Sequence, residues 1–260
     1  AIHTADRVST VSKTYAFEIQ DPYYAHGLHD VLRQHAYKLS GVVNGIDTDV
    51  FNPAGDPLIY ANFNADSLEK KAENKKFLQE RLGLAAREDA PMVIMITRLV
   101  GHKGVDLVQA VMDDLMWDDL QLVIIGTGER QYEDMFRSYA ANFPAKMSAN
   151  IIFDNTLAHQ AYAGADLVLM PSKQEPCGLT QLIAMRYGTI PIVRETGGLF
   201  DTVPAYNIET GEGNGFTFKT YNAHDMLDAV RRGESLFHDK EHWTALQKSV
   251  MAYDCSWKHS

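Results

Sequence analysis

Cysteine and long apolar runs are scarce in this sequence of 260 residues. Its two cysteines, Cys177 and Cys255, are too few and too isolated for a disulfide framework or a zinc site, and they fit a reducing compartment. No apolar run approaches the roughly 20 residues of a membrane-spanning helix, and the N-terminus lacks the charged-then-apolar pattern of a signal peptide. The chain as given is therefore expected to be soluble, with no membrane partner.

Positive charge is also in deficit. Lysine and arginine together number 24 against 34 aspartates and glutamates, which gives a net charge of -10. This balance argues against a broad surface for nucleic acid or for an anionic membrane. It still allows a small basic pocket for one phosphorylated ligand, because such a pocket needs only a few cations.

Two known site patterns are incomplete. Gly126-Thr-Gly128 begins like a dinucleotide-binding fingerprint, but Gln131 stands where the third glycine belongs, so no nicotinamide cofactor is expected. The two glycines instead let the chain turn tightly or admit a ligand. Asp47-Thr-Asp49 has a carboxylate spacing that some metal-dependent enzymes use, but it follows an Asn-Gly turn, which favours turn capping. We therefore predict no metal ion and no cofactor.

Short apolar runs rich in valine and isoleucine recur from residue 92 onward. Their brevity and lack of strict alternation are typical of parallel strands buried on both faces, and helix-like segments separate most of them. The predicted strands are Met92–Ile96, Leu122–Ile125, Ile151–Phe153, Leu167–Met170, Ile190–Val193 and Phe216–Phe218, and the predicted helices are Val105–Met116, Glu129–Phe143, Thr156–Ala163 and Gly178–Tyr187. The alternation predicts an α/β fold, a doubly wound parallel sheet of Rossmann-like type, whose ligands bind at the carboxyl ends of the strands.

The first 90 residues follow a different pattern. A strand is predicted over Arg7–Ser12, a helix over Lys13–Ile19, and a strand with an Asn-Gly turn in Gly41–Asp47. We expect residues 1–40 to be the tail of an N-terminal domain with its hinge, and residues 41–260 to be the sheet domain. The last residues bring no closing helix, so the chain is expected to be part of a longer one.

Arg98 and Lys103 lie in the loop after the first regular strand, in Arg98-Leu-Val-Gly-His-Lys-Gly104. A helix is predicted to begin just after them, and two cations beside a helix N-terminus form a good anion site. The alternative is a pair of solvated loop cations, and spacing alone does not decide between the two.

Glu175 stands in a turn, Glu175-Pro-Cys-Gly178, between an apolar strand and an apolar helix. Gly178 leaves backbone N–H groups accessible, while Glu175 supplies acceptors. Neutral polyols such as sugars need both donors and acceptors, so the turn is a candidate sugar site. The alternative is a surface carboxylate that stabilises the helix dipole.

Phe153 ends the third predicted strand, and Asp154 behind it is a candidate helix cap. An aromatic side chain at this strand end either lies against a purine or belongs to the core. The pattern leaves both interpretations open.

Six stretches, taken together, strongly resemble the ADP-glucose-dependent glucan synthases, the bacterial glycogen synthases and plant starch synthases of GT-B architecture. They run in the family's order and cover nearly the whole chain. The stretches are Ala5–Ala16, Gly41–Asp47, Lys71–Lys75, Arg98–Gly104, Glu175–Gln181 and Tyr187–Leu199.

The resemblance implies a role for each matching residue. The catalytic set would be Arg98 and Lys103, which hold the diphosphate of ADP-glucose and stabilise the ADP leaving group, and Glu175, which binds donor-glucose hydroxyls. The implied substrate-binding residues are Asn44 in the hinge, Phe153 at the adenine, Thr180 at a phosphate, and the backbone of Cys177, Gly178 and Leu179 at the sugar. The implied reaction is retaining transfer of glucose to the non-reducing 4-hydroxyl of an α-1,4-glucan, without a metal.

The resemblance covers only part of such an enzyme. The family binds its donor between two domains, and the Lys-Thr-Gly-Gly loop and histidine of the first domain have no counterpart here. The resemblance therefore implies the C-terminal, donor-binding half, truncated before the final crossing helix and nearly inactive alone. It implies a cytoplasmic location for a bacterial parent, or a plastid for a plant one. The alternatives are a stand-alone nucleotide- or glycan-binding module and another GT-B enzyme that uses a UDP-sugar.

Overall fold

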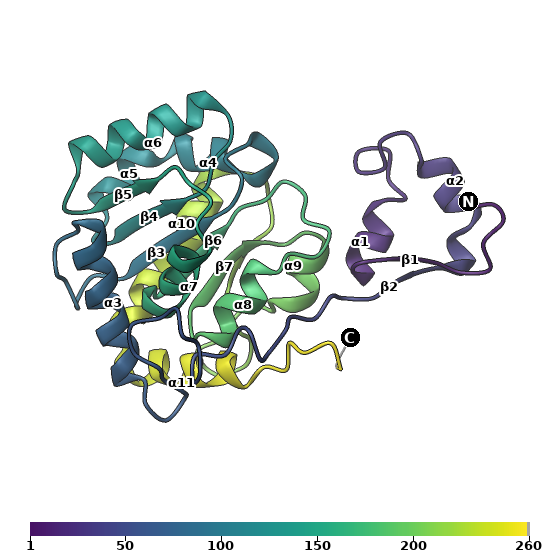
Figure 1. Cartoon of the computed structure of the whole chain (residues 1–260). Helices are drawn as coiled ribbons and strands as arrows, with labels where there is room; N and C mark the ends of the chain where they lie inside the picture. The colour runs from purple at the N-terminus through teal and green to yellow at the C-terminus, as the bar shows by residue number, and fades with distance from the viewer. Residues whose placement is uncertain (259–260) are drawn as a thin grey trace.

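Six parallel strands in the order β5-β4-β3-β6-β7-β8 form the centre of the computed structural model, which describes residues 1–258 (Figure 1). All five neighbouring pairs are parallel, which confirms the predicted doubly wound α/β sheet. The strands are β3 (Met92–Ile96), β4 (Gln121–Ile125), β5 (Met147–Asn150), β6 (Leu167–Met170), β7 (Ile190–Arg194) and β8 (Phe216–Phe218). The chain leaves β3 toward one edge and returns to β6 on the other side, so the order reverses between these two strands.

Helices cover both faces of this sheet, with α7 and α8 in front and α10 behind in Figure 1. Side-chain caps begin three of them, because Asp154 accepts from Leu157 N, Asn222 from His224 N and Asp239 from His242 N. The first of these confirms the cap predicted at Asp154. The helices of this part are α3 (Glu69–Leu82), η2 (Gly101–Lys103), α4 (Val105–Ala110), α5 (Met112–Trp117), α6 (Arg130–Asn142), α7 (Asn155–Gly164), α8 (Thr180–Arg186), α9 (Gly197–Thr202), α10 (Ala223–His238) and α11 (Lys240–Ala252).

The strand predicted at Ile151–Phe153 is wrong. β5 pairs with β4 through Met147–Asn150 and ends before the apolar run. Its sequence, Met-Ser-Ala-Asn, is weakly apolar because β5 is an edge strand and only Met147 is fully buried there. The side chains of Ile152 and Phe153 are instead 49% and 92% exposed in the following loop.

Two other boundaries also differ from the prediction. The segment Val105–Met116 forms two helices, because Val111 leaves the helical region with φ -126° and ψ 21°. The strand predicted within Gly41–Asp47 ends at Gly41, and Ile46 makes only an isolated bridge to Ser256.

Residues 1–41, the N-terminal lobe, project to one side of the sheet domain in Figure 1. A parallel pair of short strands and three short helices form it, which agrees with the strand and helix predicted at residues 7–19. These elements are β1 (Val8–Thr10), α1 (Lys13–Glu18), α2 (His29–Gln34), η1 (Ala36–Lys38) and β2 (Leu39–Gly41). The lobe joins the sheet domain through an extended linker, where Ile46 N donates to Cys255 O at 2.8 Å.

Two lysines of α3 are buried at the amino ends of the strands, opposite the predicted ligand edge. Lys75 Nζ lies 2.7 Å from Asp166 Oδ2, which also accepts from Met92 N at 2.7 Å. Lys71 Nζ donates to Tyr162 O, Ala163 O and Thr189 Oγ1. These contacts tie α3 to the loops before β3, β6 and β7.

Candidate active site

A cavity of about 130 Å³ opens where the strand order reverses, between the carboxyl ends of β3 and β6. Open α/β sheets bind their ligands at this position, because the loops after the two strands diverge there. We call it the Lys103 cavity. Its polar lining residues come from the segments after β3 and β6 and from the first turn of α8, and they are Thr97, Lys103, Ser172, Glu175 and Thr180.

Lys103 and Glu175 form an ion pair inside this cavity. Nζ of Lys103 lies 2.6 Å from Oε2 of Glu175, and the two side chains are only 19% and 10% exposed. Ser172 Oγ donates to the same carboxylate oxygen at 3.1 Å. Lys103 and Glu175 are 72 positions apart in the sequence, and the structure brings them into contact. Glu175 is thus buried and paired, which excludes the alternative of a solvated dipole-stabilising carboxylate.

Arg98 reaches the same edge of the sheet but is exposed, and within the described residues its guanidinium has no hydrogen-bond partner. The loop that carries it is electropositive. Burial lowers the pKa of His102 below its ordinary value, and the charges of Lys103 and Arg98 lower it further. A free cation beside a paired one provides two charges for an anionic ligand.

The turn of residues 175–178, the Glu175 turn, is held by Gln181 of α8. Its amide Nε2 donates to Cys177 O and Gly178 O, each at 3.0 Å. Gly178, Leu179 and Thr180 line the Lys103 cavity, whereas Cys177 is buried behind it. Burial raises the pKa of the Cys177 thiol, so this side chain is neutral at physiological pH and its role is confined to packing and its backbone.

A second cavity, of about 310 Å³, adjoins the first and shares Ile96, Thr97 and Thr180 with it. We call it the Phe153 cavity. Its walls are mainly apolar and include Phe51, Ile125, Ile152, Phe153, Tyr162 and Ile183, and Arg98 also lines it. Because Phe153 is 92% exposed and lines this space, it is not a core residue, and the interpretation as a ring-stacking residue is the one left open.

The two glycines of the loop after β4 serve close packing. A Cβ on Gly126 would lie 1.8 Å from Thr97 O, and one on Gly128 would lie 2.2 Å from Leu99 O. The loops after β3 and β4 therefore touch through backbone alone, and this contact forms one wall of the Phe153 cavity.

Sequence reasoning missed His159, which lines the Phe153 cavity although it is only 3% exposed. Its Nδ1 lies 2.7 Å from Oδ2 of Asp56, and Phe51 stacks on its ring. The two members of this pair are 103 positions apart, so no local spacing could have revealed it.

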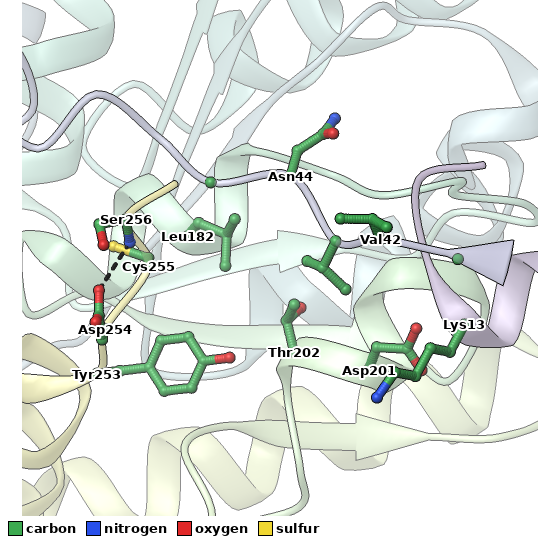
Figure 2. A pocket seen from close by; sticks show the side chains of 13 residues that line it. Lys13, Val42, Asn44, Leu182, Asp201, Thr202, Tyr253, Asp254, Cys255 and Ser256 are labelled. Atoms are coloured by element: carbon green, nitrogen blue, oxygen red, sulfur yellow. Dashed lines mark hydrogen bonds between the residues drawn. The ribbon is translucent and has the colours of Figure 1, made fainter. Parts of the chain in front are cut away.

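Asn44 is not brought into the Lys103 cavity. It lies in the linker and borders a third cavity, of about 400 Å³, between the lobe, α8, α9 and the segment after α11. Figure 2 shows its amide pointing away from Thr202 and Tyr253, which line the cavity with Lys13 and Asp201. The backbone of Asn44 is nevertheless close enough to Cys177 to lower the pKa of its thiol, against the larger effect of burial.

The carboxylate of Asp47 shows the predicted turn capping. Asp47 Oδ1 accepts from Asp49 N at 3.0 Å and from Val50 N at 3.1 Å. Within residues 1–258, no group of three or more His, Cys, Asp or Glu side chains is arranged to hold a metal ion. In the same part of the chain, none of the helices is both long and apolar enough to cross a membrane.

Residues 77–248 match the family described as Glycosyl transferases group 1, and residues 1–34 match the starch synthase catalytic domain. Glycogen synthases from Bacillus cereus (strain Q1) and Clostridium acetobutylicum are 52% and 51% identical over 100% and 98% of this chain. The chain covers 54% of each, so it spans about half the length of the curated relatives it matches.

Solved structures give the same result. The catalytic domain of starch synthase IV from Arabidopsis thaliana, bound to ADP and acarbose, is 40% identical with a TM-score of 0.93, over 99% of this chain and 54% of that one. A sucrose-phosphate synthase from Thermosynechococcus elongatus, 19% identical with a TM-score of 0.65 over 99% and 56% of the chains, shares the fold alone. The chain therefore belongs to the group 1 glycosyl transferases of GT-B architecture, and it is related to the C-terminal region of glycogen synthases.

Proposed function

We propose that this chain is the donor-binding half of an ADP-glucose-dependent glucan synthase, a hexosyltransferase. The whole enzyme would transfer glucose, with retention, from ADP-glucose to the non-reducing 4-hydroxyl of an α-1,4-glucan. One observation carries the proposal: the largely buried Lys103–Glu175 pair lies at the switch point of the sheet, in a cavity that adjoins the apolar cavity lined by the unpaired Arg98. The relatives are glycogen synthases, and the similar starch synthase structure is bound to ADP and acarbose.

The cations act on the diphosphate. Arg98 and Lys103 would bind its oxygens, and Thr180, in the first turn of α8, would donate its hydroxyl to one of them. When the bond between glucose C1 and the phosphate oxygen breaks, its electron pair remains on ADP. The acceptor hydroxyl oxygen forms the new bond to C1, and its proton passes to the departing phosphate. Fixed positive charge at that phosphate stabilises the transition state.

The Glu175 turn acts on the sugar. The carboxylate of Glu175 would accept hydrogen bonds from donor-glucose hydroxyls, and the backbone at Cys177, Gly178 and Leu179 would supply contacts from the other side. Lys103 orients this carboxylate through the 2.6 Å contact between its Nζ and Glu175 Oε2. A preformed site lowers the cost of ordering on binding.

The remaining residues bind the two ends of the ligand. Phe153 would stack on adenine at the mouth of its cavity, where Arg98 joins it to the phosphate site. Asn44 would act from the hinge, through the linker that borders Cys177.

The domain assignment forms part of the proposal. Residues 1–40 would be the end of a preceding GT-B domain and its hinge, and residues 41–260 the nucleotide-sugar-binding domain, in a cytoplasmic enzyme. GT-B transfer needs a cleft between two domains, so this chain alone should bind the donor and transfer little glucose.

Calorimetric titration with ADP tests the proposal. Losing a charge-assisted phosphate contact in Arg98→Ala or Lys103→Ala should cost about 1.5–3 kcal/mol of binding free energy. Lys76→Ala is the matched control, because Lys76 is exposed on α3 at the amino-end side of the sheet. Unchanged affinity in both site variants would sink the phosphate assignment.

Competition between donors tests the nucleotide. In the full-length enzyme, ADP-glucose should bind more tightly than UDP-glucose, because a purine covers more of the apolar Phe153 cavity than a pyrimidine. Tighter binding of UDP-glucose would favour a UDP-sugar transferase of the same fold.

A further inference from the structure

Two short helices from opposite ends of the sequence donate to each other's carboxylates. Oδ2 and Oδ1 of Asp201, in α9, accept from Thr14 N at 3.0 Å and from Thr14 Oγ1 at 2.6 Å in the first turn of α1. Oε1 of Glu18, in α1, accepts from Gly197 N at 3.0 Å and from Thr196 Oγ1 at 2.9 Å at the start of α9. Each helix therefore supplies a carboxylate to the free N–H groups of the other.

The start of α9 is also the support of the Glu175 turn. Gly198 N donates to Glu175 O at 3.1 Å and to Pro176 O at 3.2 Å. At Gly197, with φ +45°, an added Cβ would lie 2.0 Å from Glu175 O. The two backbones thus meet without an intervening side chain, so a displacement of the Thr196–Gly198 segment displaces Glu175.

The far end of α9 contacts the same turn through Gln181. Thr202 Oγ1 donates to Gly198 O at 2.6 Å and accepts from Gln181 Nε2 at 3.1 Å. Because Gln181 also holds Cys177 O and Gly178 O, α9 and the Glu175 turn form one hydrogen-bonded unit. Among residues 1–258, the side-chain hydrogen bonds between the lobe and α9 or its cap Thr196 are those of Glu18 and Thr14.

Within the described residues, the carboxylate of Glu18 accepts side-chain or backbone hydrogen bonds only from Thr196 and Gly197. Its second oxygen, Oε2, is buried and lacks a hydrogen-bond partner within the described residues. That oxygen would lie 3.5 Å from a Cβ on Gly197, so it stays beside the same backbone segment. A buried acceptor left unsatisfied costs free energy, which argues that the position of Glu18 is set by its contacts to α9.

We propose that Glu18 is a positioning residue for the donor-glucose site. It connects the N-terminal lobe, through Gly197 and Gly198, to the Glu175 turn, so that the placement of the lobe sets the placement of Glu175. The sugar-binding part of this inference rests on the proposed function, whereas the mechanical connection does not.

Hydrogen exchange tests the connection directly. Glu18→Ala loses the hydrogen bonds from Gly197 N and Thr196 Oγ1 and should speed amide exchange in residues 175–180 and 196–199 by at least roughly 3- to 10-fold, the effect of losing one ordinary hydrogen bond. Exchange in β3 and β4 should stay unchanged. Glu18→Gln keeps an acceptor for Gly197 N and should largely restore slow exchange. Unchanged exchange at residues 175–180 in Glu18→Ala would overturn the proposal.

Binding provides a second readout that general damage to the fold does not reproduce. Glu18→Ala should weaken ADP-glucose by roughly 3- to 10-fold and ADP by less, because the sugar would contact the Glu175 turn directly whereas ADP would depend on it only through the Lys103–Glu175 pair. Asp239→Ala is the matched control, since Asp239 also caps a helix N-terminus, that of α11, away from the site. Equal weakening of both ligands in Glu18→Ala would overturn the positioning role.

A milder variant covers the case in which Glu18→Ala does not fold. Thr196→Val removes the hydroxyl donor to Glu18 and should give the same pattern with a smaller change; no change would count against the proposal.

Failure of the proposed function can be told apart from failure of this inference. If the unaltered chain bound neither ADP nor ADP-glucose, the proposed function would fail, and hydrogen exchange would still test whether Glu18 connects the lobe to the Glu175 turn.

Discussion

The sheet domain and the N-terminal lobe are held by different kinds of contact. The sheet domain buries entire strands: in β3, β4, β6 and β7, nearly every side chain is inaccessible. The lobe buries few side chains, and these are Ser12, Ala16, Ala25, Leu32 and Lys38. It faces α9 through carboxylates and backbone N–H groups. Apolar burial is strong and non-directional, whereas these polar contacts are weak singly and fix an orientation.

The two kinds of contact therefore have different effects: apolar burial stabilises the sheet domain, whereas the polar contacts orient the lobe on α9. The free energy of unfolding should reside in the sheet domain, because it contains the continuous core. The lobe should open at a lower free energy, since local opening follows the number of buried apolar contacts. A part that opens easily and contacts α9, which supports the Glu175 turn, is well suited to couple its own movement to that turn.

The largest effect is expected inside the sheet domain, in Lys75→Ala. Asp166, 7% exposed, would remain buried with its carboxylate unpaired, and breaking a buried ion pair in this way costs about 3–5 kcal/mol. Urea unfolding followed by circular dichroism measures the loss. Lys76→Ala, one position along α3 and exposed, should change the free energy of unfolding by less than about 0.5 kcal/mol. Similar losses in the two variants would mean that the buried pair adds nothing to the domain.

Lys71 predicts how the stability of the same domain depends on pH. Burial lowers its pKa from 10.5 to about 7, whereas in the unfolded chain the amine keeps its proton up to its ordinary pKa. Between these values the unfolded state binds more protons, so the free energy of unfolding should rise with pH. The slope is at most about 1.4 kcal/mol per pH unit for one group.

Urea unfolding at several pH values above neutral checks this dependence. Lys71→Met has no amine to titrate, so subtracting its pH profile from that of the unaltered chain isolates the contribution of Lys71. Parallel profiles would show that the amine stays protonated, held by its three oxygen acceptors.

The contrast also explains which parts of the fold the sequence could predict. Strands buried on both faces carry a continuous apolar signal, so β3, β4, β6, β7 and β8 were all predicted within one or two residues. The edge strand β5 lacks that signal, and the apolar run after it lines a cavity instead. An apolar run in the sequence predicts a surface that avoids water. That surface is either part of the protein core or, as with residues 152 and 153, the wall of a cavity.

The sequence could likewise predict site residues whose positions follow from local structure, but not those whose contacts depend on tertiary packing. Arg98, Lys103, Glu175 and Phe153 could be singled out because each follows a strand whose carboxyl end faces the ligand edge. The ion pair of Lys103 with Glu175 and the contacts of Glu18 depend on tertiary packing over 72 and 179 positions. No local pattern encodes such pairs.

Ser12→Ala tests the lobe side of the comparison, with a smaller expected effect. Ser12 Oγ accepts from Tyr15 N at 2.9 Å and caps α1, and losing such a cap costs about 1 kcal/mol. The loss should appear as faster amide exchange in residues 13–18, with the urea midpoint of the sheet domain unchanged. Ser138→Ala, exposed on α6, is the control. A shifted midpoint would show that the lobe and the sheet domain unfold as one unit.

The smallest effect is expected for an exposed polar contact on the sheet domain, in Arg231→Ala. Arg231 Nε lies 2.9 Å from Asp118 Oδ2, but the arginine side chain is 48% exposed, and solvent screens such pairs to about 0–1 kcal/mol. Urea unfolding at low and high salt measures it, and the small difference between Arg231→Ala and the unaltered chain should shrink further as salt rises. If Arg231→Ala lost as much free energy as the Ser12 cap contributes, exposed polar contacts would stabilise the sheet domain as much as polar contacts stabilise the lobe. The contrast between the two regions would then be wrong.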